Sequence, residues 1–355
     1  MYKYCSHCGH QAAQESNFCA RCGTRLEDIV DGIEFQNEEK EEHAQSDYKE
    51  NTSYDNSKEY TAQPMTDSFS PDEVDSISAS CKVCNVEITT TDTDRIKVIW
   101  EKTDSWSLIP HIQGRTLHMK ERYRLGIHNI HDFFHNSGHN VIRIELPRNK
   151  EFDLEIENET GSILVSNVNV RKQAELKTSI GRIEVENLKA VEGLFVNTGT
   201  GSMRISQVET GQIVRLGSQI GKIQADHIKT VSFFSNSTGG RCAFNDILTT
   251  GQFTVTGGVG DLRLDNITSQ KMDVRMNASG NINCQNLYSD SSIAIYNTVG
   301  NITCSIRDDV ANYTTHCHSD QGHNNYPEVS GKGEKSLNVR TSLGSVDVFF
   351  TGSGI

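Results

Sequence analysis

Apolar and polar residues alternate along residues 158–350 in a block that recurs about every 20 residues. A glycine marks each regular block, at positions 161, 181, 201, 221, 240, 260, 280 and 300. The second residue after each glycine is apolar: Ile163, Ile183, Met203, Ile223, Cys242, Leu262, Ile282 and Ile302. The fourth is also apolar: Val165, Val185, Ile205, Ala225, Phe244, Leu264, Cys284 and Cys304. Mostly polar residues separate the two positions, and this period of two predicts a half-buried β-strand.

Each block carries one more apolar position and a second short strand. The seventh residue after the glycine is apolar: Val168, Leu188, Val208, Ile228, Ile247, Ile267 and Leu287. Apolar pairs before the glycines, such as Leu194/Val196 and Ile293/Ile295, predict the second strand. One block cannot bury its apolar face alone, whereas stacked blocks align these positions into a continuous core. We therefore expect an all-β fold, a parallel β-solenoid (β-helix) of about 20-residue coils, with regular coils over 158–306.

A polar column runs beside the apolar ones, six residues after each glycine. Its members are Asn167, Asn187, Gln207, His227, Asp246, Asn266 and Asn286. We interpret it as a ladder of side-chain hydrogen bonds along one edge of the stack. A carbohydrate-binding edge is the alternative, but no aromatic column accompanies these residues. Cys284 and Cys304 fall one coil apart in an inward column, where free cysteines act as small hydrophobes; a disulfide or redox pair is the alternative.

The regular pattern is interrupted after residue 306. Residues 307–335 predict a degenerate coil, and residues 336–350 a final regular one, with Leu337, Val339, Val346 and Val348 at the apolar positions. The degenerate coil carries His316, Cys317, His318 and His323, so metal binding there stays open. An irregular coil that covers the exposed edge of the stack is the simpler interpretation.

Residues 80–157 predict entry coils without the regular glycine. Val86/Ile88 and Ile96/Val98 alternate as strands do. Cys81 and Cys84 form a lone C-x-x-C that we interpret as structural, since no second pair accompanies it. Four histidines are expected in a polar, solvent-exposed loop between strands: His128, His131, His135 and His139. Whether they bind a metal or sense pH stays open.

The first 26 residues predict a separate zinc ribbon. Two copies of C-x-x-C-G supply four candidate metal ligands, Cys5, Cys8, Cys19 and Cys22. Two residues between thiolates allow both sulfurs to reach one tetrahedral Zn²⁺ ion, and the glycine permits the turn of a metal knuckle. A unit this small has almost no apolar core, so a structural Zn²⁺ must supply its folding free energy. Four protein ligands leave no open position for catalysis by this ion.

An acidic linker is expected over residues 27–79. This segment holds 16 Asp and Glu against three Lys, which accounts for the net charge of −13 of the whole chain. Its few apolar residues cannot offset the entropy of ordering, so we expect disorder. A solvated spacer is the simplest function, and an acidic bait for a basic surface, or a self-masking segment, is the alternative.

Composition excludes several classes of function. No basic stripe exists, so we expect no nucleic-acid binding through phosphate contacts. No run of 18 apolar residues predicts a membrane span, and no apolar segment of a secretory signal opens the chain. Ten cysteines, four with metal spacing and most others at buried positions, are typical of a reducing compartment, so we expect a cytoplasmic protein. No small-molecule substrate is evident.

The segment Val141-Ile142-Arg143-Ile144-Glu145-Leu146-Pro147, followed by Thr160-Gly161-Ser162-Ile163 and its copies, resembles the bacterial putative-adhesin β-solenoid family, long named a domain of unknown function. The resemblance covers residues 80–350 and implies the solenoid fold. It also implies an association with cell-envelope stress, since members in Gram-positive bacteria have that link. The ribbon resembles short zinc ribbons at the N-termini of many bacterial proteins. The family carries no catalytic residues over to this chain.

The pattern favours a non-enzymatic scaffold: a zinc ribbon tethered to a solenoid that presents a rigid surface to a protein partner, in envelope-stress or regulatory assembly. A surface adhesin exported by a non-standard route is the alternative. A third class is an enzyme built like the pectin-acting β-helices. Such enzymes need clustered carboxylates along one outward face, and the outward positions here repeat no pair of Asp residues. We therefore expect no enzymatic activity.

Overall fold

The computed structural model describes residues 2–4, 11–13, 63–103, 106–123 and 140–352. The chain divides into two units, Met1–Lys58 and Glu59–Ile355. In the first unit, β1 (Tyr2–Tyr4) and β2 (Gln11–Ala13) pair as antiparallel strands. The four predicted zinc ligands, the histidines of 128–139 and residues 27–62 of the predicted linker lie outside the described residues.

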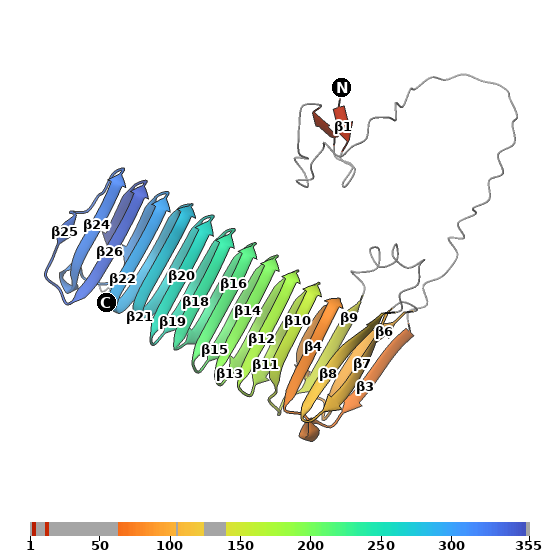
Figure 1. Cartoon of the computed structure of the whole chain (residues 1–355). Helices are drawn as coiled ribbons and strands as arrows, with labels where there is room; N and C mark the ends of the chain where they lie inside the picture. The colour runs from red at the N-terminus through yellow and green to blue at the C-terminus, as the bar shows by residue number, and fades with distance from the viewer. Residues whose placement is uncertain (1, 5–10, 14–62, 104–105, 124–139, 353–355) are drawn as a thin grey trace, which may run out of the picture. The chain divides into compact units, whose positions relative to one another are not determined.

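The second unit is a β-solenoid in which two rows of strands enclose the core (Figure 1). Row A consists, in spatial order, of β7 (Trp106–Gln113), β8 (Thr116–Tyr123), β4 (Ser76–Val83), β10 (Asp153–Thr160), β12 (Gln173–Ile180), β14 (Gly193–Thr200), β16 (Ile213–Ile220), β18 (Ser232–Gly239), β20 (Gln252–Val259), the second halves of β21 (Leu262–Ser279) and β22 (Ile282–Val299), β26 (Lys335–Leu343), β24 (Tyr313–Gln321) and β25 (Val329–Ser330).

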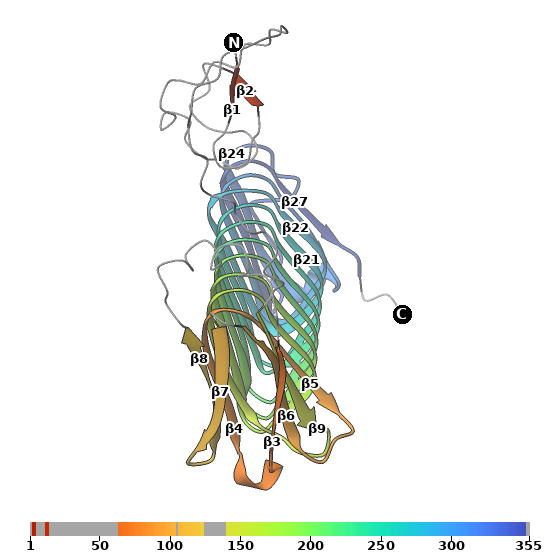
Figure 2. The same ribbon diagram turned by 90° about the vertical axis from the view of Figure 1, so that its right-hand side faces the viewer.

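Row B consists of β3 (Gln63–Phe69), β6 (Ile96–Lys102), β9 (Val141–Pro147), β5 (Asn85–Thr91), β11 (Ile163–Val170), β13 (Ile183–Ala190), β15 (Met203–Thr210), β17 (Ile223–Thr230), β19 (Cys242–Thr249), the first halves of β21 and β22, β23 (Ile302–Ile306) and β27 (Val346–Phe350). Two short 3₁₀ turns, η2 (Pro71–Glu73) and η3 (Val310–Asn312), connect strands at the two ends of the stack. Viewed nearly end-on, successive coils close into one tube (Figure 2).

The predicted columns form the core of this tube. The apolar residues two, four and seven positions after the glycines are all buried in one continuous cluster. Neighbouring coils pair in parallel and in register, for example Ile163 with Ile183 and Ile183 with Met203. Each apolar side chain therefore packs on its counterpart in the next coil, which confirms the parallel solenoid of about 20-residue coils.

The polar column owes its composition to the backbone. All seven of its residues adopt a positive φ of 51–57°, where the coil bends between two short straight segments. Asn, Asp and His tolerate this left-handed conformation better than most residues. The predicted ladder is also present in part: Asn187 Nδ2 donates to Asn167 Oδ1 at 2.8 Å, and Asn286 Nδ2 donates to Asn266 Oδ1 at 3.0 Å.

The C-terminal coils do not stack in chain order. β26 and β27 pair directly with β22 and β23, and β24 lies on the outer side of β26 (Figure 1). Gly344 accordingly packs against Gly300, and Gly322 against Gly344. The segment predicted as a degenerate coil before the last one is therefore the outermost strand. Its partner β25 pairs with it in antiparallel fashion, so the irregular segment covers the edge of the stack as expected.

The N-terminal end begins earlier than predicted. β3, η2 and the start of β4 occupy residues that the sequence assigned to a linker ending at 79 and a solenoid starting at 80. Val74 and Ile77 are buried, and Met65 and Phe69 pack on the core. These few apolar residues are therefore enough to order the segment once a partner strand is present. The entry strands also differ in direction, because β3, β6 and β7 pair antiparallel with their neighbours.

Candidate interaction surface

An outward column on row A concentrates aromatic and arginine side chains. Phe195 on β14, Arg215 on β16 and Phe234 on β18 lie directly beside one another in register. Arg215 is exposed and the two phenylalanines are half-buried. The guanidinium carbon of Arg215 lies 5.3 Å from the ring centroid of Phe234, a cation–π contact. We name these three residues the Phe–Arg–Phe strip.

The strip has uncharged polar neighbours on one side and acidic neighbours on the other. A depression of about 260 Å³ beside Arg215 and Phe234 is lined by Asn236, Thr254 and Thr256. In the other direction, the same column continues as Glu175 and Glu155. Toward the N-terminal end, the two members of the column that follow the strip are therefore carboxylates.

A second exposed apolar line follows the glycine turns. Ile180, Ile220 and Val259 immediately precede a glycine and are 56%, 64% and 54% exposed. Small or polar residues, Thr200 and Gly239, occupy the same position in the coils between them. From Ile180 to Val259 the apolar side chains of this turn ridge therefore stand on alternate coils, whereas Val299 and Leu343 at the C-terminal end lie on directly paired coils.

The candidate metal residues of the C-terminal coil are not brought together. Cys317 on β24 is buried, whereas His316 is exposed on the opposite side of the strand, as alternation along a strand requires. His318 instead contacts two carboxylates, with Nε2 2.9 Å from Asp320 and Nδ1 3.1 Å from Glu328. The structure therefore gives no support to a metal site at His316, Cys317, His318 and His323.

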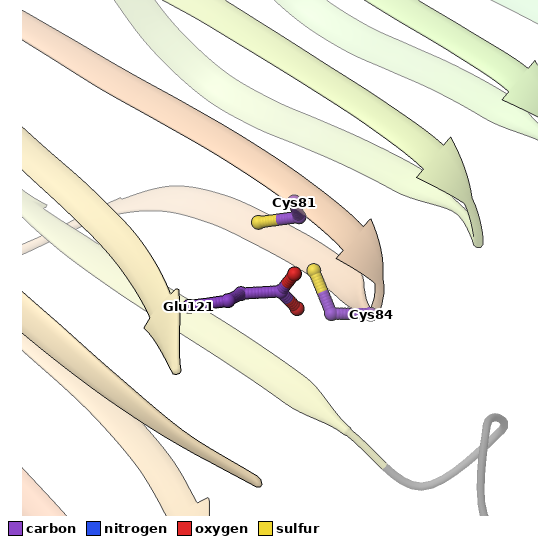
Figure 3. A group of neighbouring side chains, drawn as sticks. All are labelled: Cys81, Cys84 and Glu121. Atoms are coloured by element: carbon purple, nitrogen blue, oxygen red, sulfur yellow. The ribbon is translucent and has the colours of Figure 1, made fainter. Parts of the chain in front are cut away.

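The other cysteines of the solenoid are free and buried. Cys284 and Cys304 pair in register, and burial raises the pKa of both thiols, so they serve as small apolar side chains. Cys81 and Cys84 lie at the N-terminal end, with Glu121 of β8 beside them (Figure 3). Hydrogen bonding between the two thiols, their burial and the nearby carboxylate raise the pKa of Cys84. Glu121 belongs to no repeating pattern in the sequence, so sequence reasoning missed it. The pairing of β4 with β8 places it beside the two cysteines.

Within the part of the chain that the structure describes, no helix has the length and apolar character needed to cross a membrane.

Comparisons with known proteins give a family match to each part of the chain. A family model described as Toastrack DUF4097 matches residues 74–348, and one described as a zinc-ribbon domain matches residues 4–26. No curated protein matches the chain. One similar solved structure is titled as a "putative cell adhesion protein" from Clostridium sporogenes ATCC 15579; it is 9% identical, covers 82% of this chain and 100% of its own, and has a TM-score of 0.20. The two family matches agree with the resemblance drawn from the repeat and with the predicted ribbon.

Proposed function

The chain belongs to the Toastrack DUF4097 family, and we propose that it acts as a non-enzymatic scaffold that binds a protein partner through row A of its solenoid. The observation that carries this proposal is the Phe–Arg–Phe strip. Aromatic residues and arginine are enriched in the buried centres of protein interfaces and dominate their binding energy. Here three of them are consecutive on a rigid, hydrogen-bonded surface, so little ordering entropy is lost on binding.

The chemistry of the strip defines the partner. Phe195 and Phe234 offer apolar area, and the exposed Arg215 between them offers a planar donor that suits a carboxylate. A protein surface with an apolar side chain next to an Asp or Glu fits this arrangement. Glu155 and Glu175 farther along the column would repel an acidic partner that shifted by two or three coils, and so would fix its position.

The zinc ribbon is proposed as a second, tethered binding module. Cys5, Cys8, Cys19 and Cys22 form a donor set of four thiolates, which fits Zn²⁺ in a closed structural site. Zn²⁺ bound there would supply folding free energy to the ribbon. Two modules on one chain raise the effective concentration of each for a partner that both can reach.

The proposal is tested by capturing partners with the full chain as bait and comparing matched variants. Phe195→Ala with Phe234→Ala, and separately Arg215→Glu, should weaken binding of a captured partner at least about tenfold. Asn338→Ala, in the same column near the C-terminal end, is the matched control and should leave binding unchanged. A Cys5→Ser/Cys8→Ser variant separates binding by the ribbon from binding by the solenoid. Partners that are retained equally by all strip variants would contradict the proposed surface.

The proposed setting is the cytoplasm, in envelope-stress or regulatory assembly. The free, buried cysteines of the described chain support a reducing compartment, and the family resemblance supports the link to envelope stress. Cell fractionation tests the location, and the expected result is recovery in the cytoplasmic fraction. Recovery at the cell surface would instead favour the alternative function, an adhesin exported by a non-standard route.

A further inference from the structure

The turn after β4 differs from the three turns stacked next to it in row A, those at Gly161, Gly181 and Gly201. In these three turns, a buried polar side chain three residues before the glycine donates to the carbonyl of the adjacent turn: Asn158 Nδ2 to Cys84 O at 2.6 Å, Thr178 Oγ1 to Gly161 O at 3.2 Å, and Thr198 Oγ1 to Gly181 O at 3.3 Å. Cys81 occupies this position in the next coil toward the N-terminus, in register with Asn158. A thiol is a weak donor, so Cys81 does not supply the hydrogen bond that these three turns use.

Cys84 occupies the place of the glycine in the same turn. Gly161 packs directly against the carbonyl of Cys84, as Gly181 packs against that of Gly161. The C-x-x-C spacing therefore coincides with the turn, and both thiols are buried, at 3% and 0% exposure. Two buried thiols at a tight turn can direct both sulfur atoms to one side, which is the arrangement of a metal knuckle.

Glu121 completes the cluster from a different strand. Ser80 pairs with Lys120, so the following residues, Cys81 and Glu121, lie side by side on β4 and β8. The two sulfur atoms and a carboxylate oxygen all lie within 4.8 Å of one another (Figure 3). Small rotations of the side chains bring such atoms to metal–ligand distances of about 2.0–2.3 Å.

The carboxylate is held in place by further hydrogen bonds. The buried indole Nε1 of Trp106 donates to Glu121 Oε1 at 3.0 Å, and the backbone N–H of Lys82 donates to Oε2. Outer partners of this kind orient ligating carboxylates in metal sites. A carboxylate packed against two buried thiols is also an electron-rich environment that a cation would stabilise.

We propose that Cys81, Cys84 and Glu121 bind a divalent transition metal, Zn²⁺ by the softness of two thiolates, separately from the N-terminal ribbon. Both thiol protons leave to solvent when the metal binds. Three protein ligands leave the fourth position open. Cys81 and Glu121 also line a cavity of about 690 Å³, together with His111 and His118. Water or an added small ligand can occupy that position.

Metal content of the full chain, purified under reducing conditions and loaded with Zn²⁺, tests the proposal. We expect two zinc ions per chain, falling to one in Cys81→Thr and to one in Cys5→Ser/Cys8→Ser, and to none when both changes are combined. Cys81→Thr supplies the residue that the turns at Thr178 and Thr198 use, so the coil should still fold. Cys284→Ala, which removes another buried thiol, is the matched control and should retain two.

Cobalt gives an independent readout of the ligands. In the Cys5→Ser/Cys8→Ser chain, one Co²⁺ should bind with a thiolate charge-transfer band, and Cys81→Thr should abolish that band. Glu121→Gln should keep the fold and weaken Zn²⁺ binding by about 10-fold or more in competition with a chelator. A full chain with one zinc ion, unchanged by Cys81→Thr and by Glu121→Gln, overturns the proposal. A Cys81–Cys84 disulfide that persists under these reducing conditions, with no Zn²⁺ bound at the turn, overturns it equally.

Discussion

At the scale of single residues, two unusual backbone conformations shape the seven coils that begin at Gly161 to Gly280. The turn glycines have φ of 124–156°, and each lies so close to the next that no side chain fits between them. The polar residues six positions later lie at φ of 51–57°, where the coil bends. Glycine satisfies the first requirement and Asn, Asp or His the second. The two columns are thus explained by the backbone before any side-chain contact is considered.

Gly260→Ala should be strongly destabilising. At φ of +130°, the added Cβ would lie 2.2 Å from the carbonyl oxygen of Gly240, a backbone atom that cannot move without shifting a coil. We expect a loss of about 3 kcal/mol or more, measured by chemical unfolding. Gly217→Ala is the control, because its Cβ would meet only the side chain of Asn197, at 3.3 Å. A similar, small change in both variants would contradict this account of the turn.

Substitutions at Asn266 can separate the backbone conformation from the side-chain ladder. Asn266 has φ of +56°, donates to Asn245 and accepts from Asn286. Asn266→Gly removes the ladder contacts but keeps a residue that adopts the left-handed conformation at little cost. Asn266→Ala removes the ladder contacts and also makes the left-handed conformation unfavourable. We expect alanine to be the more destabilising by about 1 kcal/mol in thermal or chemical unfolding. Equal losses would mean that the ladder alone stabilises the bend.

At the scale of elements, the crossing of the C-terminal strands depends on a largely buried ion pair. Lys335 Nζ at the start of β26 lies 2.7 Å from Asp308 Oδ2, just before η3, with side-chain exposures of 18% and 7%. Lys335 also lies 4.3 Å from the ring centroid of Tyr288. These contacts hold together two points of the chain: the end of β23, where the chain leaves the stack, and the start of β26, where it returns. On its return the chain inserts β26 between β22 and β24.

Asp308→Ala should lower the free energy of local unfolding at this end of the solenoid by about 2–3 kcal/mol, because it removes the carboxylate that pairs with the amine of Lys335. Burial by itself would raise the pKa of Asp308, but hydrogen bonds from Lys335 and Asn312 outweigh it and lower the pKa. The stabilisation is therefore present above the ordinary pKa of an aspartate, about 3.9, and is lost as the pH falls through the lower folded value.

Hydrogen exchange of the β24 and β26 amides measures this effect locally, as suits a repeat protein that opens from its ends. Protection should fall in strong acid for the natural chain and depend less on pH in Asp308→Ala. Glu157→Gln, which removes the exposed ion pair with Lys177, is the control and should change nothing measurable. Identical pH profiles in all three proteins would contradict a role for Asp308.

The elements also show where prediction from sequence succeeds and where it stops. The periodic columns were sufficient to predict the parallel coils, because each position of the repeat has the same environment in every coil. β3 escaped prediction because its partner β6 lies about 30 residues further on and only pairing makes its few apolar residues sufficient. The spatial order of β22, β26 and β24 likewise depends on contacts without a local signature. Cys81 and Cys84 were visible as a motif, but Glu121 joins them only through the register of β8.

At the scale of the whole solenoid, stability depends on how the two ends of the stack are closed. A solenoid has two terminal coils whose backbone groups could pair with another chain. Here antiparallel strands lie outermost in both rows at the N-terminal end, β3 and β7, and in row A at the C-terminal end, β25; row B ends there in β27, which pairs in parallel with β23. An antiparallel strand interrupts the parallel repeat, so another copy of the regular coil cannot simply continue the stack.

Removal of β3 should therefore expose the edge of β6 and cause self-association. A chain that begins at residue 70 leaves the backbone groups of β6 that now pair with Gln63–Phe69 without partners, and it uncovers the core beneath Met65 and Phe69. A chain that begins at residue 59 keeps β3 and is the matched control. Light scattering after size-exclusion chromatography should show a concentration-dependent increase in mass for the shorter chain alone. Equal masses for the two chains would mean that the loops beside β6, rather than β3, protect this end of the solenoid.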